Sequence, residues 1–154
     1  MKEKLSDFAL IAEIISAVCI VASLLFVGVQ IQQNTDIQKA SSYQNVIDEI
    51  ALWRSQIVSN PELSELFGLF ANGTLFENST ENDIRRITMQ VTNFFGAVES
   101  AYYSKKYGLM GDSEWERLES AVCIQSHDYK ENFGENNSPS YISTEFSTFL
   151  EETC

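Results

Sequence analysis

The sequence predicts an all-α protein in which an N-terminal transmembrane helix leads into a small up-and-down helical bundle. A long apolar stretch lies near the N-terminus, later apolar residues recur at helical spacing, and no segment shows sustained two-residue alternation. We therefore expect three parts: an N-terminal flank at residues 1–7, the transmembrane helix at 8–31, and an acidic helical bundle domain at 32–154.

The transmembrane helix is predicted from the stretch between Phe8 and Val29, in which Glu13 is the one charged residue. A helix of these 22 residues would be about 33 Å long, close to the roughly 30 Å of bilayer hydrocarbon. The alternatives are a cleaved signal peptide, a lipid-modified Cys19 and a buried helix of a soluble protein. We favour an uncleaved anchor in the lipid bilayer, because the exit lacks an A-x-A-like site, Val18 precedes Cys19, and residues 14–29 show no amphipathic face.

Charges beside the span bear on its orientation. Lys2 and Lys4 precede it, and Lys39 alone follows within about 20 positions. We expect a single-pass protein of the cytoplasmic membrane with a slight preference for a cytoplasmic N-terminus, and the side of the soluble domain stays open.

Two features of the span are candidates for function. Glu13 is an ionisable group near the bilayer, although a span beginning at Ile14 would leave it among the head groups. Small or weakly polar residues share one helix face, on which a second copy of the chain could pack and form a homo-oligomer: Ala12, Ser16, Cys19 and Ser23.

After the span the chain turns polar and then shows an amphipathic helical stripe. Thr35 and Gln38 have the form of a capping box, which would start a new helix, but we favour one continuous helix to about Ser59. The apolar residues of the stripe recur every three or four positions: Tyr43, Val46, Ile47, Ile50, Trp53 and Ile57.

The next two helices have clear end signals. Asn60 followed by Pro61 predicts the start of a helix that Asn72 and Gly73 end after about Ala71. Thr80 with Asp83 then predicts the longest helix of the domain, to about Leu109. Their expected core residues are Leu63, Leu66, Phe67, Phe70, Ile84, Ile87, Val91, Phe94, Phe95, Val98 and Tyr102.

Two more helices complete the bundle. Asp112 is the expected cap of a helix that ends in a loop over 132–137, and Ser138 with Pro139 is expected to start the last helix. Their apolar positions are Trp115, Leu118, Val122, Tyr129, Ile142, Phe146, Phe149 and Leu150.

The sequence offers little for catalysis or for a cofactor. His127 is the only histidine and is expected at the surface, and the chain holds no Glu-x-x-His, no phosphate-binding glycine loop and no nucleophile elbow. We therefore predict no enzyme, no metal site and no cofactor. Ten basic against 22 acidic residues, a net charge of −12, also make nucleic acid an unexpected partner.

The three cysteines fit none of the zinc spacings. Cys19 lies in the span, and Cys123, beside Val122, is expected to be a core thiol. A bridge between Cys123 and Cys154 would require that the domain face an oxidising compartment.

Acidic residues are concentrated in 111–154, where ten stand against Arg117 and Lys130. A solvated surface explains them, and the alternative is a docking face for a basic protein partner.

Aromatic residues cluster between the long helix and the next one. This cluster consists of Glu99, Tyr102, Tyr103, Tyr107 and Trp115. Aromatic side chains at such a corner usually lock two helices together, and the alternative is a small-ligand or sensory pocket.

One resemblance accompanies these features. The segment Val29–Thr35, the pair Tyr102–Tyr103 three residues after Glu99, the run Tyr107–Leu109 and Trp115 together resemble an uncharacterised family of small bacterial single-pass membrane proteins. The resemblance covers residues 8–150 and implies the anchored architecture, without any activity. We therefore expect a membrane-anchored helical module that acts through partner or self-association.

Overall fold

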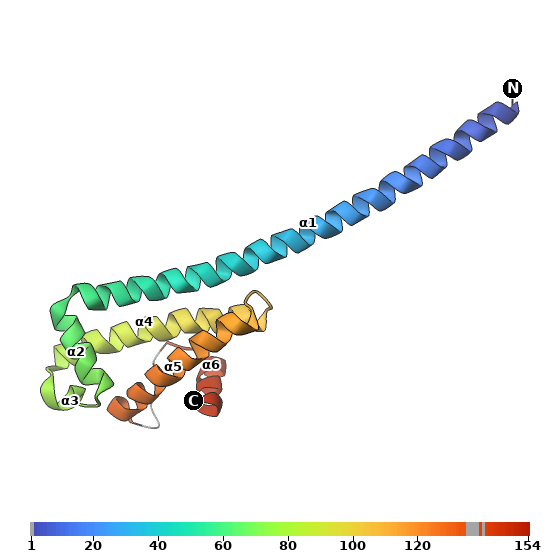
Figure 1. The fold of residues 1–154 in the computed structure, drawn as a ribbon. Helices are drawn as coiled ribbons and strands as arrows, with labels where there is room; N and C mark the ends of the chain where they lie inside the picture. The colour runs from blue at the N-terminus through green and yellow to red at the C-terminus, as the bar shows by residue number, and fades with distance from the viewer. Residues whose placement is uncertain (1, 135–138, 140) are drawn as a thin grey trace. The chain divides into compact units, whose positions relative to one another are not determined.

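The computed structural model of the protein describes residues 2–134, 139 and 141–154, and within them it contains six helices and no strand. The helices are α1 (Lys2–Ser59), α2 (Pro61–Ala71), α3 (Leu75–Asn78), α4 (Glu81–Lys106), α5 (Asp112–Phe133) and α6 (Thr144–Thr153) (Figure 1). The predicted fold class is therefore confirmed: a long apolar N-terminal helix leads into a helical bundle.

The chain divides into two compact units, Met1–Gln38 and Lys39–Cys154. The boundary falls within α1, which is one helix from Lys2 to Ser59, without the predicted alternative break near Thr35. Thr35 instead donates its hydroxyl hydrogen to the carbonyl of Ile31 over 3.0 Å, a bond that a residue inside a helix makes with the preceding turn.

The second unit is built on three longer segments, residues 39–59 of α1, α4 and α5. Helices α4 and α5 lie side by side and antiparallel (Figure 1). The indole Nε1 of Trp53 on α1 donates to the carbonyl of Gln90 on α4 over 2.8 Å, and Nδ2 of Asn132 on α5 donates to the carbonyl of Phe70 over 2.7 Å. These bonds fix α1 on α4 and the end of α5 on the end of α2.

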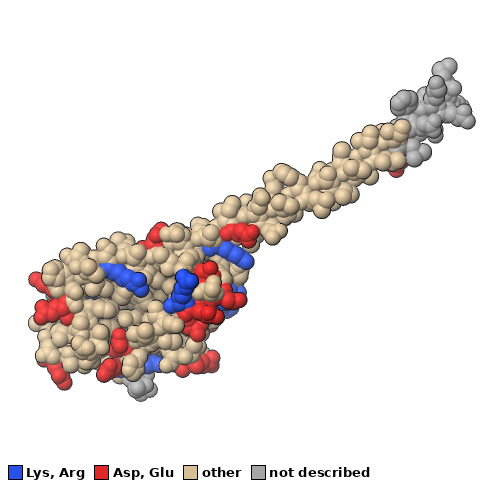
Figure 2. All heavy atoms as spheres, in the orientation of Figure 1, with Lys and Arg blue, Asp and Glu red and all other residues tan. Residues whose placement is uncertain are grey.

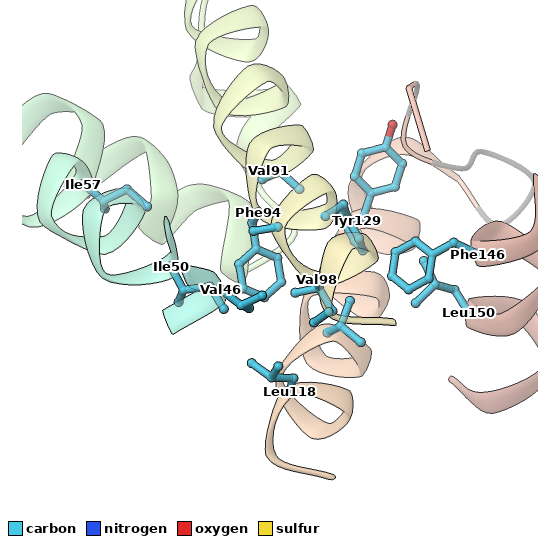
Figure 3. Close-up of a cluster of buried hydrophobic side chains, with 14 of the residues drawn as sticks. Val46, Ile50, Ile57, Val91, Phe94, Val98, Leu118, Tyr129, Phe146 and Leu150 are labelled. Atoms are coloured by element: carbon cyan, nitrogen blue, oxygen red, sulfur yellow. The ribbon is translucent and has the colours of Figure 1, made fainter. Parts of the chain in front are cut away.

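The interior is filled by aliphatic and aromatic side chains from all six helices. Figure 3 shows side chains of α1, α4, α5 and α6 that meet in it. Eight of the largest are fully buried: Phe70, Phe95, Phe146, Leu75, Ile87, Val91, Val98 and Val122. Each of the seven outside α3 lies at an apolar position that the helical spacing predicts, which is why the sequence located the core well.

Helices α2 and α4 begin as their sequences predict, and α2 also ends where expected. The Asn60 side chain accepts from the N–H of Leu63, and Thr80 with Asp83 forms a complete capping box. Both helices end in a Schellman motif with a glycine at positive φ, Gly73 at 68° and Gly108 at 73°. Because Gly108 takes this conformation, α4 stops at Lys106 rather than near Leu109.

Two further boundaries and one short helix differ from the prediction. The N-cap of α5 is Gly111, and Asp112, expected as the cap, is the first helical residue. The last helix begins at Thr144, where the Ser143 hydroxyl accepts from the N–H of Phe146 over 3.2 Å, so Ile142 precedes the helix. The expected start at Ser138 lies outside the described residues. The short helix α3 was not predicted, and its Leu75 is fully buried.

Candidate functional site

The structure brings the predicted aromatic corner together, and it adds helix α6 to it. The Tyr102 ring on α4 lies 6.0 Å from the Trp115 ring on α5 and 5.4 Å and 5.1 Å from the rings of Phe146 and Phe149 on α6, measured between centroids. The Tyr103 ring is 5.3 Å from Tyr102. These edge-to-face and tilted contacts are those of rings that fill space against one another.

The polar atoms of the corner are also paired. The Tyr102 hydroxyl donates to Oε1 of Glu145 over 3.0 Å, and Lys106 Nζ forms a salt bridge with the same oxygen. Hydrogen bonds from Lys106 and then from Tyr102 lower the pKa of Glu145, and the same carboxylate raises the pKa of Lys106. Burial, followed by the bond to Glu145, raises the pKa of Tyr102, so its hydroxyl stays protonated as a donor.

Glu99 and Tyr103 hold the first residues of α6. Oε1 of Glu99 accepts from the backbone N–H of Ser143 over 2.8 Å, and the Tyr103 hydroxyl lies 2.9 Å from Oγ of Ser143. Ser143 is itself the N-cap of α6. The predicted residues Glu99, Tyr102, Tyr103 and Trp115 therefore form a clamp that joins α4, α5 and α6, and the side-chain oxygens of Glu99, Tyr102 and Tyr103 are bonded within it.

Glu13 lies far along the chain from this clamp, in the unit Met1–Gln38, and its side chain is exposed on α1. The residues around it expose large apolar side chains on every side of the helix. Leu24, Leu25 and Phe26, which point in three different directions, are 67%, 69% and 64% exposed. By length and composition, the part of α1 beginning at Ile11 is the one candidate membrane span among the described residues.

Cys123 and Cys154 form a disulfide, with their Cα atoms 5.0 Å apart. The expectation that Cys123 is a free core thiol is therefore wrong. Cys123 lies on the side of α5 that faces α6, only partly buried, and the end of α6 brings Cys154 to it. Cys19, on α1, is free and exposed.

The acidic residues of 111–154 extend around much of the surface of α5. On the face of the Lys39–Cys154 domain that Figure 2 shows, acidic residues lie at several separate places with basic residues among them. At 100° per residue, Asp112, Glu116 and Glu119 fall on one flank of the helix, Asp128 falls on the other, and Glu131 lies between the two flanks. Asp112 and Glu145 are also paired with Lys105 and Lys106 of α4. The charge is thus spread around the helix.

Residues suited to a metal ion are not brought together in the part of the chain that the structure describes. No three His, Cys, Asp or Glu side chains form a cluster there, and His127 is exposed.

One arrangement was not predicted from the sequence. A hollow of about 190 Å³ lies where α1, α4 and α5 meet, and two arginines line it, Arg54 from α1 and Arg117 from α5. The signal in the sequence was weak: Tyr43, Ile47, Ile50 and Arg54 share one face of α1, and nothing local shows that Arg117 comes to the same place.

Comparisons of the chain with protein families, with curated proteins and with solved structures found no match. The resemblance to small bacterial single-pass proteins stays a prediction.

Proposed function

We propose that the protein is a membrane-anchored helical module of a bacterial cytoplasmic membrane that acts by associating with itself or with a protein partner. One observation carries this proposal, the all-round apolar surface of α1 between Ile11 and Ile31. Its large apolar side chains are between 47% and 69% exposed. A helix that is apolar on all sides is stable only inside a protein core or inside a bilayer, and no part of the described chain covers this one.

The Lys39–Cys154 domain is proposed to face the oxidising side of that membrane. The disulfide between Cys123 and Cys154 supports this side, because disulfides persist in oxidising compartments and are rare in the cytosol. The lysines support it independently. Lys2 and Lys4 precede the span and only Lys39 follows closely, which favours a cytoplasmic N-terminus.

Self-association is proposed to use the small face of the span. Ala12, Ser16, Cys19 and Ser23 recur at spacings of four, three and four, and all are exposed. The Ser23 hydroxyl donates to the carbonyl of Cys19 over 2.8 Å, so this hydroxyl is paired within the helix. Small side chains let two helices approach closely, where dispersion contacts between them are strongest.

The alternative of a ligand pocket at Tyr102, Tyr103 and Trp115 gains no support from the corner, since its rings pack together and its hydroxyls are paired. A basic partner for 111–154 gains little, because the acidic residues lie on both flanks of α5.

Oxidative crosslinking in native membranes tests the proposal, because Cys19 is the one free cysteine among the described residues. Copper phenanthroline should convert the chain to a dimer through Cys19. A matched variant carries Cys19→Ser with Val21→Cys, which moves the thiol about 200° around the helix, and it should crosslink far less. A chain found in the soluble fraction would contradict the anchor. Equal crosslinking from both positions would contradict association through this face. So would the absence of any crosslinked product from either position, whether a dimer of the chain or the chain joined to a partner protein.

A further inference from the structure

The hollow between α1, α4 and α5 has an apolar floor and a basic rim. Buried side chains form the floor, one from each helix: Ile50, Phe94 and Leu118. Figure 3 shows these three side chains converging from their separate helices. The exposed arginines Arg54 and Arg117 also line the hollow.

The two guanidinium groups are not paired with carboxylates in salt bridges. Neither Arg54 nor Arg117 forms a salt bridge with any residue that the structure describes, whereas Arg85, Arg86, Lys105 and Lys106 all do. Glu114 lies close enough for Arg117 to contribute to its lowered pKa, but the main causes are hydrogen bonds to that carboxylate from its own backbone N–H and then from the Ser113 hydroxyl. Two positive charges thus face the hollow in a protein whose net charge is −12.

From this geometry we infer that the hollow binds a small amphipathic anion, with its carboxylate or phosphate on Arg54 and Arg117 and its hydrocarbon on the apolar floor. Guanidinium groups bind both anions through parallel N–H donors, and such charge-assisted bonds are about twice as strong as neutral ones. Each methylene group of the ligand that leaves water for the apolar floor strengthens binding. Neither feature alone selects this class of ligand, but the two together do.

The volume limits the size of the ligand. About 190 Å³ is below the roughly 300 Å³ at which pockets for drug-sized ligands begin, so a nucleotide or a large cofactor does not fit. A fatty acid of about eight carbons does, and so does the terminal part of one anionic lipid. Tyr43 lines this hollow and also a neighbouring one of about 430 Å³ that Lys39 lines, which gives a longer ligand room to continue.

Octanoate is the probe, added to the full-length chain in discs of phosphatidylcholine. The NMR signals of the Ile50 and Leu118 methyl groups are read, because octanoate that merely enters the bilayer does not shift them. We expect a saturable shift, and octanol, which has the chain without the charge, should bind at least tenfold more weakly. Arg54→Gln and Arg117→Gln should each weaken binding about tenfold. Arg85→Gln is the matched control, since Arg85 pairs with Glu81 and does not line the hollow, and it should leave binding unchanged.

A second variant removes the space instead of the charge. Ala121 lines the hollow on α5, so Ala121→Leu should abolish the shift while both arginines remain. In a parallel arm, phosphatidylglycerol replaces part of the lipid and no octanoate is added. An arginine-dependent shift in that arm alone would identify membrane lipid as the source of the anion. The inference is overturned if neither octanoate nor phosphatidylglycerol shifts these signals, or if the arginine variants respond like the unaltered chain.

Discussion

The backbone N–H of Ser143 donates to Oε1 of Glu99 over 2.8 Å, although 44 residues separate the two in the sequence. Ser143 in turn caps α6 through its hydroxyl. One carboxylate on α4 therefore orients the turn that starts the last helix. This explains why Glu99 stands beside Tyr102 and Tyr103, whose hydroxyls reach Glu145 and Ser143 of the same segment.

The contribution of this bond to stability should appear as a difference between two variants of Glu99. Glu99→Leu leaves the partly buried N–H of Ser143 without an acceptor, and we expect a loss of about 1 kcal/mol or somewhat more in the free energy of unfolding. Glu99→Gln keeps a side-chain oxygen and should cost less than half as much. Urea denaturation followed by circular dichroism measures both. Equal losses would mean that the negative charge matters rather than the acceptor.

The salt bridge between Lys106 and Glu145 should make stability depend on pH at both ends of the range. The folded-state pKa of Glu145 is lowered, first by Lys106 and then by Tyr102, so its stabilising effect is present above its unfolded pKa near 4.5 and is lost as pH falls through the folded value. The pKa of Lys106 is raised, first by the hydrogen bond to Glu145, so its effect is present below 10.5 and is lost as pH rises through the folded value.

Unfolding free energies from pH 2 to pH 12 test this pair. Lys106→Met should flatten the acid slope that belongs to Glu145 and remove the alkaline one that belongs to Lys106. Lys130→Met serves as the control, because Lys130 lies in the last turn of α5, and it should preserve both slopes. A Lys106 variant with an unchanged profile would show that the pair contributes nothing measurable, as many exposed pairs do.

The capping box of α4 should carry a measurable share of stability. The Thr80 hydroxyl oxygen accepts from the N–H of Asp83 over 3.3 Å, and Oδ2 of Asp83 accepts from the backbone N–H of Thr80 over 3.3 Å. Thr80→Ala should lower the free energy of unfolding by about 1 kcal/mol. Thr80→Ser keeps the oxygen and should lower it by a few tenths at most. Thermal melts of the two variants side by side decide the matter, and a serine variant as weak as the alanine one would argue against the cap.

Local signals predicted most of the fold. Asn60, Thr80, Gly73 and Gly108 each act on the residues next to them, so their effect on helix ends could be read without the structure. The predicted start of the last helix was too early, since Pro139 is not helical and the helix begins at Thr144. The local signal favoured Ser138 because a proline follows it, whereas Thr144 follows Ser143. What selects Ser143 is a set of distant partners, Glu99 and Tyr103.

Features that depend on relative placement could not be predicted. The pairing of Cys123 with Cys154 requires that the end of α6 return to α5, and the hollow between Arg54 and Arg117 requires three helices in position. For the aromatic corner, the sequence predicted that Tyr102 and Trp115 lie together where two helices meet, but α6 was missing from the prediction. Its rings, Phe146 and Phe149, complete the packing around Tyr102.

The disulfide should determine how firmly α6 is held. Cys123 and Cys154 close a loop with a sequence separation of 31, for which the loss of chain entropy in the unfolded state corresponds to about 3.7 kcal/mol. Reduction, or the Cys123→Ser variant, should lower the melting temperature of the domain by about 15 °C. Cys19→Ser removes the free thiol instead and should leave the melting temperature unchanged.

The same disulfide also tests on which side of the membrane the domain lies. In intact cells a thiol reagent should modify Cys123 and Cys154 only after reduction if the domain lies on the oxidising side, whereas two thiols that react without reduction would place it in the cytosol.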